Sequence, residues 1–192
     1  MFNSIINRSS NLAVDDLKIR LIANKDAEQI TAYYQKNRAY LQPWEPLREE
    51  HFYTLAGWEK RLIQLTELQK HHLAYYFVIF KARSDEICGV VNFSNLVKHP
   101  FHACHVGYSL GEHYQGQGIM RRAVAATVQW LFEEHNFHRV IAGYMPRNAK
   151  SEKVLESLGF EKEGYAKDYL LINGKWEDHV LTSKINPNWQ TP

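Results

Sequence analysis

One stretch of the chain, from Tyr108 to Met120, combines features that few folds accommodate. An apolar strand-like run ends in a short polar turn, the turn carries Gly116 and Gly118, and a long amphipathic pattern follows. Apolar residues in that pattern recur at steps of three and four, which predicts a helix. A strand that enters a helix through glycines leaves backbone N–H groups unpaired at the helix N-terminus, and such groups bind anions, phosphate above all.

Two widespread phosphate-binding loops do not match this turn. No Lys-Ser/Thr pair follows the glycines, as a Walker loop requires, and the third glycine of the dinucleotide fingerprint is missing. The segment from Gln115 to Met120 instead resembles the pyrophosphate-binding segment of the GNAT acetyltransferases, Arg/Gln-x-x-Gly-x-Gly/Ala. Gln115 and Gly118 fit this pattern, whereas Met120 departs from it at the last position.

A second segment, Asn148-Ala-Lys-Ser151, closes with Leu-Gly-Phe160 and resembles the start of the fourth GNAT helix. This resemblance implies that the pantetheine arm of coenzyme A lies between two splayed parallel strands, 106–110 and 140–144, and pairs with their backbone. Asn148 would then hydrogen-bond the arm's amides. The same residue is also a good helix N-cap, and the two roles are compatible.

Further motifs extend the resemblance over nearly the whole chain, to the family of ribosomal-protein-alanine N-acetyltransferases (the RimJ type). They include Pro43-Trp-Glu-Pro46, Asn92-Phe-Ser-Asn95, Phe101-His-Ala-Cys104 and Asp178-His-Val-Leu-Thr182. The resemblance implies direct transfer of acetyl from acetyl-CoA to the N-terminal α-amine, an alanine, of a ribosomal protein, and association with the ribosome or a pre-ribosome. Two alternatives stay open: acetylation of a small-molecule amine, and a non-catalytic CoA-binding factor in ribosome assembly.

Acetyl transfer requires a neutral amine, hydrogen-bond donors for the oxyanion and a proton for the departing thiolate. Asp168 stands where related enzymes carry an acidic residue, and Glu45 is the alternative base. Many GNAT members protonate the thiolate with a tyrosine, but Leu155 occupies the corresponding position here, so Ser151 is the nearest substitute. Backbone N–H groups near Tyr108 to Leu110 are the expected oxyanion donors.

The binding residues follow from the same resemblance. For the cofactor we expect Tyr108, Ser109, Leu110, Gln115, Gly116, Gln117, Gly118, Ile119, Met120, Arg121, Asn148 and Ser151. For the acceptor we expect Tyr40, Trp44, Glu45 and Asn92. Arg121 and Arg122 lie in the first turns of a helix, where they oppose the helix dipole, so we consider for them a role in pairing with cofactor phosphates.

Hydrophobic patterning along the chain predicts one domain, residues 1–192, with a loose arm at 1–15. Strands are expected at 17–22, 73–80, 87–93, 102–110, 139–144, 169–172 and 175–182; helices are expected from Asn24 or Asp26, at 52–70, from Met120 and at 148–158. This order favours an α/β fold with helices on both faces of a mixed sheet. The GNAT fold has this order, with about seven mostly antiparallel strands, splayed at a parallel pair, and about four helices.

Composition excludes several other classes. A net charge of +2 is too small for a nucleic-acid-binding surface, so we expect no direct DNA binding. No apolar run is long enough to cross a membrane. Cys88 and Cys104 are too few for a disulfide framework and lie in apolar runs, which favours core thiols in the cytoplasm. His102 and His105 point to opposite faces of one strand, so no metal site is expected.

Overall fold

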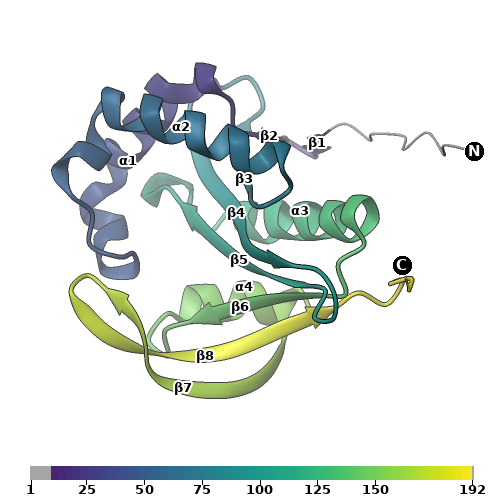
Figure 1. The fold of residues 1–192 in the computed structure, drawn as a ribbon. Helices are drawn as coiled ribbons and strands as arrows, with labels where there is room; N and C mark the ends of the chain where they lie inside the picture. The colour runs from purple at the N-terminus through teal and green to yellow at the C-terminus, as the bar shows by residue number, and fades with distance from the viewer. Residues whose placement is uncertain (1–9, 192) are drawn as a thin grey trace, which may run out of the picture.

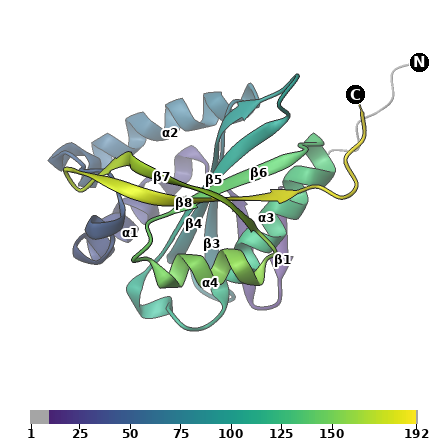
Figure 2. The ribbon, with the colours of Figure 1, turned by 90° about the horizontal axis from the view of Figure 1, so that it is seen from below.

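The computed structural model describes residues 10–191, which form one eight-stranded sheet with helices packed on both faces (Figures 1 and 2). The strands, in chain order, are β1 (Asn11–Val14), β2 (Leu17–Leu21), β3 (Tyr75–Lys81), β4 (Ile87–Val97), β5 (Ala103–Leu110), β6 (Arg139–Tyr144), β7 (Glu161–Ile172) and β8 (Lys175–Ile185). The α-helices are α1 (Ala27–Leu41), α2 (Leu55–Lys70), α3 (Ile119–His135) and α4 (Ala149–Ser157). The order across the sheet is β1-β2-β3-β4-β5-β6-β8-β7, and β5 with β6 is its parallel pair.

The mixed sheet and the four helices confirm the fold predicted from the sequence, with two differences in the strands. The stretch predicted as a loose arm contains β1, which pairs antiparallel with β2 from Asn11 to Val14. Residues 1–9 of that arm lie outside the described residues. β7 begins at Glu161, well before the predicted 169. The sequence did not reveal its first half, because these mostly exposed residues lack the apolar alternation that marks a strand.

The sheet separates two hydrophobic cores. On one face, Phe77 and Ile79 of β3 pack with α3, and on the other face Tyr76 and Val78 pack with α1 and α2. Figure 2 shows α1 and α2 on one side of the sheet and α3 and α4 on the other. β3 is covered on both faces, and all its residues from Tyr75 to Phe80 are buried and hydrophobic. In α2 the buried residues are Trp58, Leu62 and Leu65, whereas Leu55 in the first turn is 40% exposed.

Both cysteines are buried, unpaired core residues, as the sequence predicts. Burial raises the pKa of the Cys88 thiol to about 11 and that of Cys104 to about 12. These thiols therefore stay protonated at neutral pH.

A histidine pair lies at the C-terminal end of α3. The Tyr75 hydroxyl hydrogen-bonds Nδ1 of His72 at 2.7 Å and Nδ1 of His135 at 3.2 Å. Nε2 of His135 is buried without a hydrogen-bond partner among residues 10–191. Burial, with smaller contributions from His72 and Lys98, lowers the pKa of His135 from 6.5 to about 4.

This depressed pKa predicts a loss of stability in mild acid. The unfolded chain takes up the His135 proton near pH 6.5, before the folded chain does, so the free energy of unfolding falls as the pH drops from about 6.5 towards about 4. Because the ring is partly exposed, we expect the free energy of unfolding to fall by about 1–2 kcal/mol. Urea unfolding at neutral pH and at about pH 5 measures it. His135→Asn should lose less stability over this interval than the wild type or the exposed-site control His113→Asn; equal losses would contradict the prediction.

Candidate active site

The parallel strands β5 and β6 separate partway along their length. They pair from Ala103↔Arg139 to His105↔Ile141 and not beyond, although β4 continues beside β5 and β8 beside β6. The Gly111 N–H donates to the Cys88 carbonyl at 2.8 Å, and the antiparallel alternation then turns the N–H and C=O groups of Tyr108 and Leu110 away from β4. The backbone N–H and C=O groups of Tyr108 and the N–H of Leu110 therefore face the gap between β5 and β6.

The glycine turn follows directly after β5. Gly116 and Gly118 have φ angles of +74° and +66°, and a Cβ at either position would meet nothing within 4 Å. The first backbone bond of α3 runs from the Arg122 N–H to the Gly118 carbonyl, so the N–H groups of the first helical turn have no acceptor within the helix. The turn thus presents donors into open space, which fits a phosphate group.

The side chains around the turn make different contacts. Gln115 Nε2 donates to the Leu110 carbonyl at 3.2 Å and ties the turn to the end of β5. The Gln117 side chain binds Lys81 Nζ at 2.9 Å, which leaves only its backbone for a ligand. Arg122 pairs with Asp15 and Asp16 at 3.1 and 2.6 Å, which explains its place in the helix, and Arg121 is exposed.

A cavity of about 350 Å³ lies between the end of β5 and the start of α4. It brings together seven of the residues predicted for the cofactor: Tyr108, Ser109, Leu110, Gln115, Met120, Asn148 and Ser151. Tyr40 and Trp44 form its other wall. There the Lys150 ammonium donates to the Tyr40 hydroxyl at 3.2 Å, and the Arg147 guanidinium lies 4.8 Å from the Trp44 ring centroid.

Two hydroxyl groups meet inside this cavity. The Tyr108 and Ser151 hydroxyl groups are 2.7 Å apart, and burial raises the pKa of Tyr108 to about 12. From the sequence, only the backbone of Tyr108 was expected to contribute. The alternation of β5 turns this side chain towards α4 and that of Ser109 towards α1, where Ser109 meets the Tyr33 hydroxyl at 2.9 Å. Leu155 is a core residue, 1% exposed.

Asn148 caps α4, as its side-chain oxygen accepts a hydrogen bond from the Ser151 N–H at 3.1 Å. Asn148 also lines the cavity. Its side-chain NH₂ group is therefore available for the second predicted role, hydrogen bonding to the cofactor's amides.

A second cavity, of about 610 Å³, adjoins the first, since Trp44, Tyr108, Ser109, Asn148 and Ser151 line both. The predicted acceptor residues Glu45 and Asn92 line it. Gly107 makes room for Asn92, because a Cβ there would stand 3.1 Å from the Asn92 side-chain oxygen. Burial raises the pKa of Glu45, and nearby Arg48 and Arg61 partly offset that shift.

Asp168 lies apart from both cavities. It occupies a bulge of β7 with a φ of +47°, its side chain is exposed, and its N–H donates to the Asp178 carboxylate at 2.9 Å. Of the two carboxylates considered as bases, the structure brings Glu45, and not Asp168, into the wall of the second cavity.

His179 also lines the second cavity, although no sequence pattern marked it as a site residue. Its Nδ1 lies 2.9 Å from the Glu177 carbonyl, and that contact requires a proton on Nδ1. Nε2 of the neutral ring is then left as an acceptor. Only the pairing of β8 with β6, which sets His179 beside Gly143, reveals this position.

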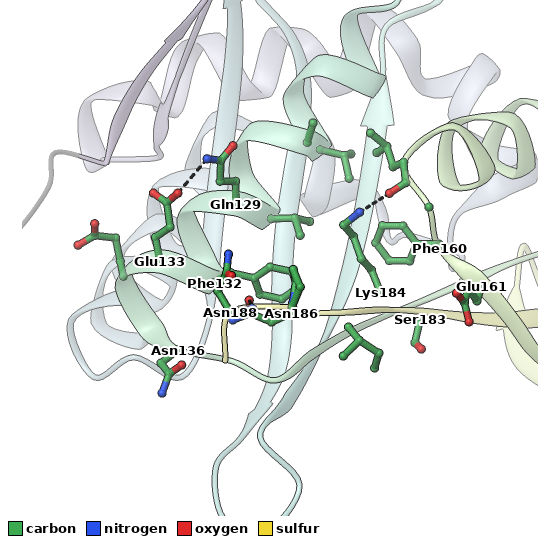
Figure 3. A pocket seen from close by; sticks show the side chains of 18 of the residues that line it. Gln129, Phe132, Glu133, Asn136, Phe160, Glu161, Ser183, Lys184, Asn186 and Asn188 are labelled. Carbon is green, nitrogen blue, oxygen red and sulfur yellow. Dashed lines mark hydrogen bonds between the residues drawn. The ribbon is translucent and has the colours of Figure 1, made fainter. Parts of the chain in front are cut away.

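A third cavity, of about 1030 Å³, lies between α3, the end of α4 and the end of β8 (Figure 3). Its polar groups largely satisfy one another: Gln129 Nε2 donates to Glu133, and the Lys184 ammonium donates to the Leu158 carbonyl. None of the predicted site residues lines it. Volume alone therefore does not identify the active site.

The histidines around the start of β5 make separate contacts. His102, the residue before β5, packs against Trp189 and His99 with ring centroids 5.4 and 6.1 Å apart, whereas His105 lies within the strand. No group of three or more metal-ligating side chains comes together among residues 10–191. Within the same residues, no helix combines the length and apolar character needed to span a membrane.

A sheet that opens at its parallel pair, beside a glycine-bearing helix N-terminus and above two joined cavities, defines the class of N-acetyltransferases. Residues 16–161 match the family described as Acetyltransferase (GNAT) domain. The chain belongs to this family and is an acetyltransferase.

Known proteins of the family resemble nearly the whole chain. "[Ribosomal protein uS5]-alanine N-acetyltransferase" of Escherichia coli (strain K12) is 47% identical over 93% of this chain and 92% of its own. The crystal structure of the ribosomal-protein-S5-alanine acetyltransferase from Vibrio fischeri has a TM-score of 0.92 and 54% identity, covering 94% of this chain and 99% of that one. Mycobacterium smegmatis RimJ, solved in complex with CoA-disulfide, has a TM-score of 0.84 and 25% identity, covering 91% and 84%.

Proposed function

We propose that this enzyme transfers acetyl from acetyl-CoA to the N-terminal α-amine, an alanine, of a ribosomal protein. The observation that carries the proposal is the junction of two cavities at Tyr108 and Ser151, one suited to the cofactor and one to the acceptor. The relative from Escherichia coli, which is named for this activity, supports the choice of acceptor. The proposal includes a single domain, action in the cytoplasm and association with the ribosome or a pre-ribosome.

The residues around the first cavity fit coenzyme A. The N–H groups from Gly116 to Arg121 suit its diphosphate, and the backbone of Tyr108 and the Leu110 N–H, with Asn148, suit its amides. When bound, the cofactor supplies an acetyl group activated as a thioester. The chain's own part is to hold that group between the two cavities and to move protons on either side of it.

Proton transfer is assigned to two places. In the acceptor cavity, the Glu45 carboxylate receives the proton of the amine. An α-amine has a pKa near 7.8, so about a third of it is already neutral near pH 7.5, whereas a lysine is roughly 0.1% neutral. A weak base therefore suffices for an α-amine. On the cofactor side, the Tyr108–Ser151 pair holds a proton that can go to the leaving sulfur.

A thiol-release assay tests the proposed function. Peptides beginning with Ala, Ser or Met are compared with an N-terminally blocked peptide that contains lysine, and with small amines. We expect release of free CoA thiol with the Ala peptide and none with the blocked one. Turnover confined to lysine or to small amines would contradict the proposal, and cofactor binding without thiol release under any acceptor would indicate a non-catalytic factor.

The hydroxyl pair gives a second test. Ser151→Ala and Tyr108→Phe should each lower kcat by more than about tenfold, because each removes one hydroxyl of the pair and little packing volume. Ser157→Ala is the matched control, since this serine is on the same helix and its hydroxyl donates to the Val154 carbonyl. Steady-state kinetics decide the matter, and near-wild-type rates in both variants would remove the pair from the mechanism.

A further inference from the structure

Two arginines of the acceptor cavity form no salt bridge among residues 10–191. Arg48 and Arg61 line the cavity, and the Nε atom of each is buried without a hydrogen-bond partner among residues 10–191. Neither guanidinium lies in a salt bridge with a residue of this part of the chain. Other shielded arginines each face a carboxylate: Arg20 pairs with Asp26, Arg122 with Asp16, and Arg139 with Glu163.

Aromatic rings hold the two guanidinium groups in place. Arg48 Cζ lies 4.7 Å from the centroid of Phe52, and Arg61 Cζ lies 5.7 Å from the same ring and 5.6 Å from Trp58. Both rings belong to the core beneath α1 and α2 and are 8% and 1% exposed. Stacking occupies the face of a guanidinium and leaves its N–H edge free, so the donors are fixed in advance of binding.

The charges of the cavity are unbalanced. Glu45 is the one carboxylate among the lining residues that the structure describes, and it faces two arginines. The positive charges of both arginines act to lower the pKa of Glu45 and that of the Tyr76 hydroxyl. An acceptor that brings only an ammonium group would meet net positive charge here. An acceptor that also brings a carboxylate would find a partner for each of its charges.

We propose that Arg48 and Arg61 form a carboxylate-binding subsite that selects acceptor peptides with an acidic side chain near the N-terminus. This inference rests on the proposed function, since the amine of the same peptide lies at Glu45. An extended chain advances about 3.3–3.6 Å per residue, so the acidic side chain is tested at the second, third and fourth positions in turn.

The test compares peptides that begin with Ala and differ only in Glu or Gln at the second, third or fourth position. At one of these positions, the wild type should show a kcat/KM at least about tenfold higher for Glu than for Gln, chiefly through KM. Arg48→Gln and Arg61→Gln should reduce this preference to below about twofold. Arg38→Gln is the matched control, because Arg38 stacks on Tyr53 at 4.1 Å and does not line the cavity; it should keep the wild-type preference.

The outcomes separate this inference from the proposed function. Acetylation of the peptides without any preference for Glu would overturn the subsite and leave the function intact. A loss in both arginine variants that is equal for Glu and Gln peptides would also overturn it, since the arginines would then act on Glu45 or on folding. Thermal melting of each variant shows whether folding is affected. Failure of every peptide with a free α-amine would instead overturn the function itself.

Discussion

Glu45→Gln is expected to lower kcat by about 100-fold near pH 7, the largest loss from any single side chain in the acceptor cavity. Glutamine keeps the shape of glutamate but cannot accept the proton of the amine. Burial already raises the pKa of Glu45, which makes its carboxylate a better base than an exposed one. Arg48 and Arg61 limit that rise in pKa and favour the ionised carboxylate.

The pH dependence distinguishes a base from a residue that only supports packing. The α-amine loses its own proton near pH 7.8, so above that pH the substrate depends less on Glu45. We expect the deficit of Glu45→Gln to shrink to about tenfold by about pH 9. A deficit that is constant with pH would indicate a binding or packing role.

Asp168→Asn is the paired control for this experiment. Asp168 was the first choice from the sequence, but it lies in an exposed bulge of β7 outside both cavities. We expect it to keep nearly wild-type kcat across the same pH range. A large loss in Asp168→Asn with none in Glu45→Gln would reverse the assignment of the base.

Gly118→Val is expected to weaken the binding of CoA by about 100-fold. Gly118 has a φ of +66°, which a β-branched residue rarely adopts, and its missing Cβ opens the space in front of the helix N-terminus. Displacing the turn would remove about two charge-assisted hydrogen bonds, each worth about 1.5–3 kcal/mol, and about 1.4 kcal/mol corresponds to a factor of ten.

Isothermal titration calorimetry with CoA measures this effect. Gly174→Val is the matched control, because Gly174 has a φ of +79°, a Cβ there would meet nothing within 4 Å, and the residue lies in the turn between β7 and β8. It suffers the same backbone strain and should bind CoA as the wild type does. Wild-type affinity in Gly118→Val would mean that the turn does not hold the diphosphate.

The sequence predicted those parts of the site that depend on neighbouring residues. Gly116 and Gly118 mark the turn because their φ angles require glycine, and Asn148 marks the start of α4 because a cap bonds a group three residues away. The strand and helix of the Tyr108–Met120 stretch follow from local periodicity. Such features depend on short-range geometry, which a sequence displays directly.

Contacts between distant segments were harder to predict. The hydroxyl contact between Tyr108 and Ser151 joins residues 43 positions apart, and it depends on which face of β5 meets α4. Asp168 was preferred over Glu45 because a motif marked its position, but a motif does not show that the bulged strand β7 carries the residue away from the cavity.

By itself, the sequence determined the order of strands and helices from β2 onwards, the glycine turn and the family, since all three depend on local patterns of residues. Only the tertiary structure decided which carboxylate reaches the acceptor cavity, which hydroxyl faces Ser151, and that Arg48 and Arg61 line that cavity without a salt bridge to any residue from 10 to 191. Burial and charge pairing arise from long-range packing of the sheet against its helices, and that packing fixes distances that residue spacing does not encode.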